Sequence, residues 1–368
     1  MRTLVIGHTY VAEDNRAKWR SIARIGSMEI DLHLPHRWPS WEHDYHPVPE
    51  THPGFRIHVA HALRTGREDQ YFFAPGFFRR MTNGAYDVLH VEQGTTSLAY
   101  AQALLERGLV SRTTRSCFFT WINWETRLPF PWSTVGRFNL RRSHGAIGGN
   151  ADAVDILKRH GFRGKTAVIP QIGVDPVFYA PGLNPALRER LQLRAFVIGF
   201  MGRLVEEKGI RILLEAARTL GPDVSVLVIG TGPFEQVLSE YRDKLHLVHV
   251  KAVPHHEVRD YLRVMNVLTL PSFVIPTWKE QFGHILIEAM ACEIPVIGSN
   301  SAAIPEVIGD AGLLFPEKSV EGLRDRIEQL RKNPSEGARL AKMGRQRVLE
   351  RFTHEKIGRQ TMEFWKTL

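Results

Sequence analysis

Cysteine is scarce in this sequence, because only Cys117 and Cys292 occur among 368 residues, and both stand in apolar surroundings. A disulfide-stabilised scaffold is therefore not expected, whereas free thiols in a reducing cytoplasm are. Long hydrophobic runs are also missing, since stretches such as 196–202 fall far short of the roughly 20 residues of a membrane-spanning helix. The apolar stretch after Met1 is too short for a secretory leader, so neither a span nor a leader is predicted.

Motifs that hold metals or activate nucleophiles are absent as well. The sequence has no Asp-x-Asp, Cys-x-x-Cys or His-Glu-x-x-His, so no metal site is predicted. It has no Gly-x-Ser-x-Gly and no Walker loop either. Gly230 and Gly232 match the first two glycines of a dinucleotide fingerprint, but Glu235 stands where the third would be, which argues against an NAD enzyme. We expect no metal and no resident cofactor.

The net charge of +9 is unevenly distributed. Residues 1–175 carry 22 basic and 16 acidic side chains (+6), and residues 176–368 carry 26 and 23 (+3). A basic half indicates an anionic partner, such as a phosphorylated substrate, an acidic membrane surface or nucleic acid. The alternative is composition bias, since arginine is frequent throughout. No nucleic-acid recognition motif is present, so nucleic acid is not expected as a partner.

Strand-like and helix-like patterns alternate along the whole chain, which predicts an α/β protein with two doubly wound, Rossmann-like domains facing a cleft. We expect an N-terminal domain at 1–178, a C-terminal domain at 179–350, and a C-terminal helix at 351–368 that can pack back on the first domain. A linker rich in proline and glycine lies at 175–185. Residues 35–53 are expected to form a long irregular loop. The predicted strands are 3–7, 29–34, 87–91, 116–120, 145–148 and 167–169, then 196–201, 225–229, 246–250, 267–270, 295–298 and 312–315.

The strongest functional signal is the string from Lys279 to Cys292. A helix is predicted to begin at about Gly283 with no side chain over its first turn, and such a helix start binds anions. Glu280 precedes the first turn of this helix. Glu288 lies five residues after Gly283, or about 7.5 Å along the helix axis. A diphosphate at the helix start would then have one carboxylate on each side, which suits a nucleotide sugar with its flanking hydroxyls. The alternative is a solvated helix face.

A second motif runs from Gly199 to Gly209, where a strand ends in a glycine turn. Arg203 and Lys208 are predicted to stand at the carboxyl end of the first strand of the second domain. There they could neutralise the charge that grows on a departing diphosphate. The alternative is surface charge paired with Glu206 and Glu207.

These motifs together resemble glycosyltransferase family 4, retaining enzymes of the GT-B fold. The resemblance covers the second domain through Gly202-Arg203-Leu204, Gly230-Thr231-Gly232-Pro233, the Glu280–Glu288 string and Ala303-Ile304-Pro305-Glu306-Val307. It extends more loosely to the first domain through 87–92 and 168–175. It implies a nucleoside-diphosphate sugar as co-substrate, and no metal is needed if Arg203, Lys208 and the helix start neutralise the diphosphate.

The resemblance also implies a role for each matching residue. Arg203 and Lys208 would hold the diphosphate, Glu280 the hydroxyls of the transferred sugar, and Glu288 the ribose. Backbone N–H groups at the helix start and the segment near the base would complete the donor site. The predicted catalytic residues are Glu280, Arg203, Lys208 and Asn123, of which Asn123 is not implied by the resemblance; the predicted donor-binding residues are Gly202, Arg203, Lys208, Gly230, Lys251, Ala252, Val253, Glu280, Phe282, Gly283, His284 and Glu288.

The first domain departs from the family at two places. The segment that begins Gly7-His8 does not contain the two glycines that many members use to approach the diphosphate. Segment 119–125 does not contain the histidine that many members place against the sugar. We predict Asn123 as the replacement, projecting into the cleft opposite Glu280, although Trp121 and its neighbours could simply pack the domain. Gly7, His8, Glu92 and Asn123 are the predicted acceptor-side residues. In the second domain, Glu293 replaces a usual glycine.

The resulting hypothesis is a cytoplasmic hexosyltransferase that moves a sugar from a UDP- or GDP-sugar to a hydroxyl of a glycan or lipid-linked acceptor, with retention and without a metal. Two alternatives remain: a nucleotide-sugar epimerase on the same fold, and a catalytically silent module that binds sugar nucleotides or glycans. Segment 71–81, with a tyrosine and four phenylalanines around Pro75-Gly76 and two arginines after them, predicts exposed rings at the inner face of an anionic membrane. The alternative is that these rings close the core of the domain.

Overall fold

The structure, a computed structural model, describes residues 1–26, 28–40, 44–75, 77, 86–110, 113–125 and 127–368. The chain forms two compact units, and each is described by itself. Unit 1 consists of Met1–Gly173 and His354–Leu368, and unit 2 of Val174–Thr353. The segment expected as a linker packs on unit 2, because Tyr179 is buried there and Arg263 donates two hydrogen bonds to the carbonyl of Ala180, at 3.0 and 2.8 Å. The division therefore falls a few residues before the predicted one.

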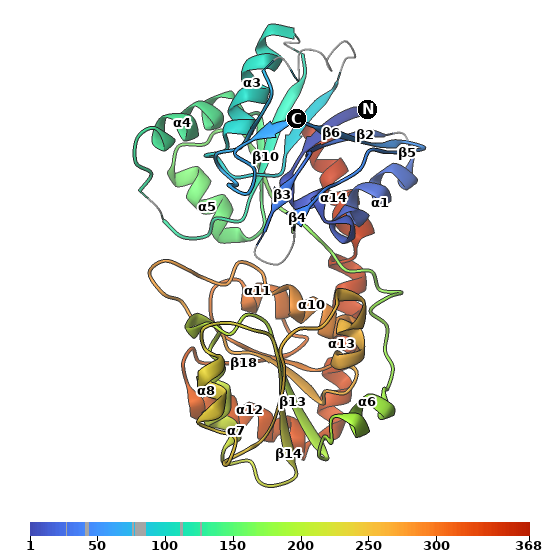
Figure 1. The fold of residues 1–368 in the computed structure, drawn as a ribbon, viewed down its shortest axis with the longest axis vertical. Coiled ribbons are helices and arrows are strands. Elements are labelled where there is room, and N and C mark those ends of the chain that lie inside the picture. Colours follow the sequence, from blue (N-terminus) through green and yellow to red (C-terminus); the bar gives the residue numbers. More distant parts are fainter. Residues whose placement is uncertain (27, 41–43, 76, 78–85, 111–112, 126) are drawn as a thin grey trace. The chain divides into compact units, whose positions relative to one another are not determined.

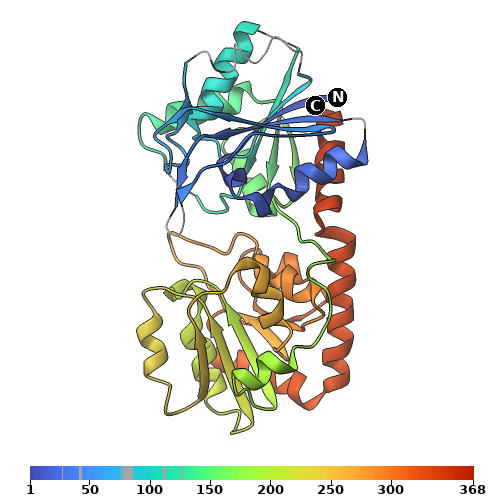
Figure 2. The same ribbon diagram turned by 45° about the vertical axis from the view of Figure 1, so that its right-hand side comes forward.

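Unit 1 is built on an eight-stranded sheet in the order β12-β11-β10-β9-β1-β2-β6-β5, parallel except for the edge pair of β5 and β6. Helices α3, α4 and α5 follow strands on one face, and α1 packs with α14 on the other (Figures 1 and 2). The strands are β1 (Arg2–Ile6), β2 (Glu29–Pro35), β5 (Glu50–His52), β6 (Phe55–Ala60), β9 (Val88–Val91), β10 (Arg115–Thr120), β11 (Gly145–Gly148) and β12 (Lys165–Val168); the helices are α1 (Ala17–Ile25), α3 (Leu98–Val110), α4 (Trp132–Arg142), α5 (Ala151–Arg159) and α14 (His354–Thr367).

The prediction of one irregular loop at 35–53 was wrong. This stretch contains the hairpin of β3 (Trp38–Pro39) and β4 (Asp44–Tyr45), followed by edge strand β5. A second small hairpin pairs β7 (Ala62–Leu63) with β8 (Phe72–Phe73). Proline is tolerated on short edge pairs where its missing N–H is not needed, so a proline-rich stretch does not exclude strands.

The exposed aromatic surface predicted at 71–81 was also wrong in its described part. Tyr71 and Phe73 are fully buried, and Phe77 stacks on Phe73 with 4.8 Å between ring centroids. These rings fill the core of unit 1, where each contributes a large apolar area. Residues 76 and 78–81 of the segment lie outside the described residues.

Helix α14 belongs to unit 1 although it closes the chain. The Trp365 ring stacks parallel to Trp19 of α1, with 6.0 Å between centroids, and its Nε1 donates to Nδ1 of His90 on β9 at 2.8 Å. An indole that is both buried and hydrogen-bonded is well fixed in one position. The last helix is thereby joined to the middle of the first sheet.

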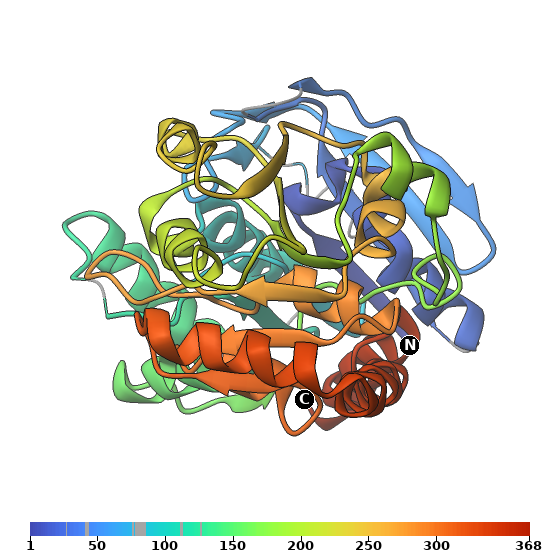
Figure 3. The same ribbon diagram turned by 90° about the horizontal axis from the view of Figure 1, so that it is seen from below.

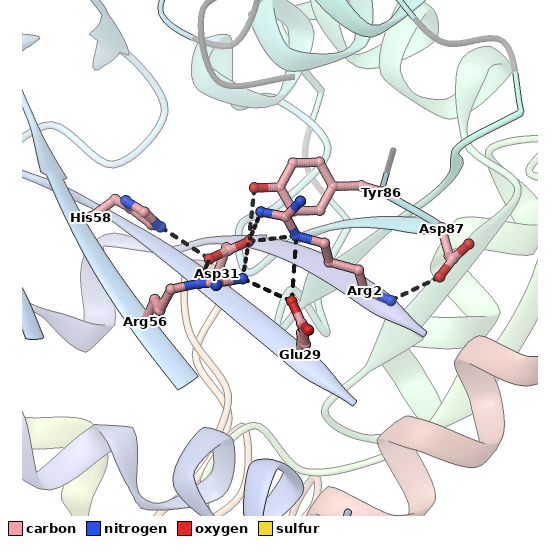
Figure 4. A network of polar contacts seen from close by, with 7 residues as sticks. All are labelled: Arg2, Glu29, Asp31, Arg56, His58, Tyr86 and Asp87. Atoms are coloured by element: carbon pink, nitrogen blue, oxygen red, sulfur yellow. Dashed lines mark hydrogen bonds and ion pairs between the residues drawn. The ribbon is translucent and has the colours of Figure 1, made fainter. Parts of the chain in front are cut away.

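A buried carboxylate ties the strands of unit 1 together (Figure 4). The Asp31 side chain on β2 accepts hydrogen bonds from Arg2 Nε (3.0 Å), Arg56 Nε (2.7 Å) and the Tyr86 hydroxyl (2.9 Å), and lies 3.0 Å from His58 Nε2. Burial alone would raise the pKa of Asp31, but these hydrogen bonds hold it well below its usual range. One charge thus joins β1, β2 and β6 to the segment before β9.

Unit 2 has a six-stranded parallel sheet in the order β15-β14-β13-β16-β17-β18. Helices α7 and α12 pack on one face, and α10 packs with α9 and α13 on the other; Figure 3 shows helices on both sides of the strands. Together the two doubly wound sheets confirm the predicted fold class. The elements are β13 (Phe196–Met201), β14 (Val224–Ile229), β15 (His246–Val250), β16 (Val267–Leu270), β17 (Val296–Ser299), β18 (Leu313–Phe315), α6 (Pro185–Arg190), α7 (Ile210–Ala217), α8 (Glu235–Ser239), α9 (Val258–Leu262), α10 (His284–Ala291), α11 (Ile304–Ile308), α12 (Val320–Lys332) and α13 (Pro334–Arg351).

Cys117 and Cys292 are free and buried, as predicted, and burial raises the pKa of both thiols. Within the described ranges, no helix combines the length and the apolar character needed to cross a membrane.

Candidate functional site

Glu280 is fixed at the carboxyl edge of the second sheet, where ligands of such sheets bind. It is 6% exposed, and its Oε2 accepts hydrogen bonds from Lys208 Nζ at 2.6 Å and from the Ser272 hydroxyl at 3.0 Å. Lys208 follows β13, and Ser272 follows β16. Ser299, the last residue of β17, donates its hydroxyl to the carbonyl of Ser272. Three neighbouring strands therefore hold one carboxylate.

Helix α10 begins four residues after Glu280, at His284, and has no side-chain cap. Its N-cap is Gly283 at φ +82°, a left-handed conformation, and a Cβ there would lie 2.8 Å from the Leu270 side chain. Phe282 is buried against Phe352, and His284 lies beside Phe282 with 5.5 Å between the ring centroids. The predicted helix start is thus present, with the positive end of its dipole next to the Lys208–Glu280 pair.

The two glycine turns of the second sheet lie against each other. Gly202 donates its N–H to the carbonyl of Ile229 at 2.9 Å, and a Cβ on Gly230 would lie 1.9 Å from the Gly202 carbonyl oxygen. Glycine at 230 is therefore required by close backbone contact as well as by its φ of +142°. Arg203 leaves this turn as an exposed side chain that makes no hydrogen bond or ion pair to the described parts of the chain.

The predicted base-contacting segment lies beside Gly230, because Gly230 donates its N–H to the carbonyl of Val250 at 3.0 Å. Lys251 and Ala252 are exposed there, and Val253 is half-buried. The Lys251 ammonium lies 3.7 Å from the Glu235 carboxylate. The structure thus brings Gly230 and residues 251–253 together at the end of β14 and β15.

Glu288 lies within α10, one turn beyond its start, and is half-buried. Burial raises the pKa of its carboxyl to about 7, and a hydrogen bond from Tyr179 acts in the opposite direction. It has no ion pair with any described residue. Glu288 therefore differs electrostatically from Glu280, which has a lysine partner.

The predicted acceptor-side residues of unit 1 follow the carboxyl ends of three strands: Gly7 and His8 follow β1, Glu92 follows β9 and Asn123 follows β10. A Cβ on Gly7 would lie 2.9 Å from the Tyr10 ring. The His8 ring stacks on Trp38 with 4.4 Å between centroids, and its Nδ1 is 2.9 Å from Gln93 Nε2. Both residues are thus held by the loops around them.

Glu92 is buried in an ionic cluster rather than at a surface. Its Oε1 accepts from Lys18 Nζ at 2.6 Å and lies 3.2 Å from His90 Nε2, and its Oε2 accepts from Gln171 at 2.9 Å. Burial alone would raise the pKa of Glu92, but Lys18 and His90 lower it to about 2. With both oxygens engaged, Glu92 is placed to support the loops of unit 1 rather than to contact an acceptor directly.

Asn123 follows β10 and is 1% exposed within unit 1. The neighbouring Trp121 packs edge-on against Phe119 and donates its Nε1 to Gln171 at 2.8 Å. The structure therefore shows packing around Asn123, and its position opposite Glu280 stays a prediction.

Four residues of these clusters were not predicted from the sequence: Lys18, Gln171, Ser272 and Trp278, whose ring centroid lies 4.9 Å from Lys208 Nζ. Ser272 carried a usable signal, because it is a polar residue directly after a buried strand, where site residues of parallel sheets stand. No sequence pattern pointed to Lys18 or Trp278, because their partners Glu92 and Lys208 are far away in the sequence. Among the described residues, no group of three histidine, cysteine or acidic side chains is arranged to hold a metal ion.

The motifs of unit 2 lie within a segment that is similar to known proteins. Residues 187–347 match the model of the glycosyl transferases group 1. The chain is 33% identical over 180 residues to the capsular polysaccharide biosynthesis glycosyltransferase CapM of Staphylococcus aureus. This alignment covers 47% of this chain and 46% of that protein. It is 26% identical over 306 residues to a GDP-mannose-dependent phosphatidylinositol monomannoside mannosyltransferase of Mycolicibacterium smegmatis, which covers 76% and 77%. The match to CapM thus spans about half of that relative.

Solved structures resemble the whole chain. Sucrose-phosphate synthase from Thermosynechococcus elongatus superimposes with a TM-score of 0.74 at 20% identity, covering 100% of this chain and 99% of that one. HepE from Anabaena in complex with UDP gives a TM-score of 0.74 at 17% identity, covering 100% of each chain. At these levels of sequence identity, the structural similarity establishes the fold alone. The chain accordingly has the GT-B fold, and its residues 187–347 match the glycosyl transferases group 1.

Proposed function

We propose that this chain is a retaining hexosyltransferase of glycosyltransferase family 4. It would move a sugar from a UDP- or GDP-sugar to a hydroxyl of a glycan or lipid-linked acceptor, with no metal. The observation that carries the proposal is the Lys208–Glu280 pair, held at 2.6 Å beside the uncapped start of α10 within the matched segment. The UDP complex of HepE and the GDP-mannose dependence in the name of the mycobacterial relative support a nucleotide-sugar donor.

The chemistry of the pair supports same-face substitution over a covalent intermediate. A covalent route requires a carboxylate oxygen directly beneath the anomeric carbon, where it forms a glycosyl-enzyme. Glu280 instead has Oε2 hydrogen-bonded to both Lys208 and Ser272. In the proposed mechanism the leaving phosphate oxygen takes the acceptor proton, while Arg203, Lys208 and the α10 start stabilise the growing negative charge.

The test has two parts. UDP, GDP and ADP are first compared for their effect on the melting temperature, since a ligand that binds only the folded state raises it. The UDP- or GDP-sugars of the stabilising nucleotide are then incubated with and without acceptors. Nucleotide release that depends on the acceptor supports the transferase; strong binding without turnover would instead identify a silent binding module. Failure of every nucleotide to raise the melting temperature would contradict the proposed donor site.

Glu288 gives the proposal a pH dependence. If its carboxylate accepts hydrogen bonds from the ribose hydroxyls, binding requires the ionised form, whose pKa is about 7. The affinity for UDP or GDP should therefore rise between pH 6 and pH 8. The ratio of wild-type to Glu288→Gln affinity, measured calorimetrically, cancels the titration of the nucleotide phosphate itself. A ratio that stays constant with pH would contradict the ribose role.

We also propose that unit 1 contacts an anionic membrane at the inner face, as a lipid-linked acceptor would require. Support comes from α4 and the segment before it. Phe130 is 83% exposed just before α4, and Arg127, Arg137, Arg141 and Arg142, in the same segment and along the helix, are exposed as well. Residues 126–151 contain no aspartate or glutamate. A stretch that combines an exposed ring with exposed arginines and lacks acidic residues suits the boundary between lipid headgroups and acyl chains.

Co-sedimentation with vesicles containing anionic lipid tests this contact. Wild type should bind at low salt and be released at high salt, because the attraction is screened. Phe130→Ser combined with Arg141→Gln and Arg142→Gln should abolish binding. Leu183→Ser is the matched control, because Leu183 is 89% exposed but belongs to unit 2. Negligible binding by wild type at low salt would favour a soluble acceptor.

A further inference from the structure

The segment between β16 and Glu280 forms a small fixed turn. Ile275 and Trp278 exchange backbone hydrogen bonds at 3.0 and 3.2 Å, which leaves Pro276 and Thr277 exposed at the tip. The base of the turn is anchored separately, because Phe273 donates its N–H to the carbonyl of Glu207 at 2.9 Å. The Trp278 backbone is therefore held from both ends of the segment.

The ring of Trp278 lies against the ammonium group that pairs with Glu280. Lys208 Nζ is 4.9 Å from the Trp278 ring centroid and 2.6 Å from Glu280 Oε2. A cation at this distance from an indole is attracted by the electrons of the ring. A lysine side chain has a flexible four-carbon stem, so a single ion pair leaves it several conformations. The ring supplies the second contact that restricts Lys208.

We propose that Trp278 is a positioning residue that holds the Lys208 ammonium toward the donor diphosphate. The inference rests on the proposed function, in which Lys208 binds that diphosphate. A phosphate arriving at the start of α10 competes with Glu280 for the same ammonium. The Trp278 ring keeps the ammonium beside both partners, so that Lys208 does not turn toward solvent when its contact with Glu280 loosens. Trp278 itself need not touch the sugar.

The experiment compares two substitutions of similar apolar character. Trp278→Leu removes the aromatic face, and Trp278→Phe keeps one. Calorimetric titration with UDP and with GDP should show at least about fivefold weaker binding by Trp278→Leu, and binding within about twofold of wild type by Trp278→Phe. Thr277→Ala, at the exposed tip of the same turn, is the matched control and should bind as wild type does.

A double-mutant cycle separates positioning from general packing. In a Lys208→Met background, Trp278→Leu should cause no further loss of affinity, because the cation that the ring holds is gone. An equal loss in both backgrounds, or normal binding by Trp278→Leu, would overturn the inference. If Lys208→Met weakens binding while Trp278→Leu does not, only this inference fails. If wild type binds neither UDP nor GDP, the proposed function fails instead.

Discussion

Glu280→Gln is expected to lower kcat at least about 100-fold, the effect of losing one preorganised charged group that acts on the transition state. The substitution keeps the shape of the side chain but removes the charge that Lys208 and Ser272 share at Oε2. Lys208 then loses its carboxylate partner, and the transferred sugar loses a charged acceptor for its hydroxyls. The loss should appear in kcat more than in KM, because a carboxylate that accepts hydrogen bonds from the sugar hydroxyls stabilises the positive charge that the sugar ring gains in the transition state.

The matched control is Glu206→Gln, which makes the same chemical change at an exposed residue two positions before Lys208. Its kcat should equal that of wild type. Steady-state rates of nucleotide release with acceptor present measure both variants, and melting temperatures check that both are folded. Wild-type turnover by Glu280→Gln would show that the donor site is not in this part of unit 2.

Lys18→Met is expected to lower the free energy of unfolding of unit 1 by about 3–5 kcal/mol, the usual cost of breaking a buried ion pair on one side. Lys18 is 2% exposed, and the Glu92 carboxylate that it contacts is fully buried. Without the ammonium, Glu92 must remain as an uncompensated charge or take up a proton. The double variant Lys18→Met/Glu92→Gln removes both charges and should recover most of the loss.

Denaturant unfolding followed by tryptophan fluorescence suits this measurement, because seven of the eight tryptophans lie in unit 1. Arg20→Met is the matched control on the same helix. Its ion pairs to Glu13 and Glu50 are more exposed, so the expected loss is about 1 kcal/mol or less. Equal midpoints for Lys18→Met and wild type would show that the buried pair contributes nothing to stability.

The same pair predicts how stability depends on pH. The pKa of Glu92 is lowered to about 2 in the folded chain, whereas an unfolded glutamate titrates near 4.3. The ionised carboxylate therefore contributes stability above about pH 4.3, and this contribution is lost as the pH falls toward 2. The double variant lacks the group and should lose less stability over this range.

The fold of unit 2 could be predicted almost completely from the sequence. The bounds expected for β13 and β15 are those observed, Phe196–Met201 and His246–Val250. Parallel strands that are buried on both faces appear in the sequence as continuous apolar runs, so their positions are easy to predict. In unit 1, β6 (Phe55–Ala60) was missed because Arg56 and His58 interrupt its apolar pattern. The structure explains why these two polar residues stand in a strand, because both contact Asp31 of the neighbouring strand.

The backbone conformation at Glu293 explains why the resembling family uses glycine at this position. The sequence alone indicates only a changed turn where the resembling family uses glycine. The structure places Glu293 at φ +56°, in the left-handed region that glycine enters without steric cost. The backbone conformation is therefore retained here with a residue that is strained in it.

The sequence by itself determined the local parts of the candidate site: the uncapped start of α10, the glutamates on either side of it, and the glycine turns. These follow from residues close together in the chain. Only the tertiary structure decided which side chains meet, since Lys208 and Glu280 are 72 positions apart and His90 and Trp365 are 275 apart. The physical reason is the strand order, because a doubly wound parallel sheet places the carboxyl ends of distant strands side by side. The sheet thus brings Ser272, Lys208 and Glu280 into contact. In unit 1, burial places Glu92, predicted as an acceptor-side residue, and Tyr71, predicted as an exposed ring, inside the domain.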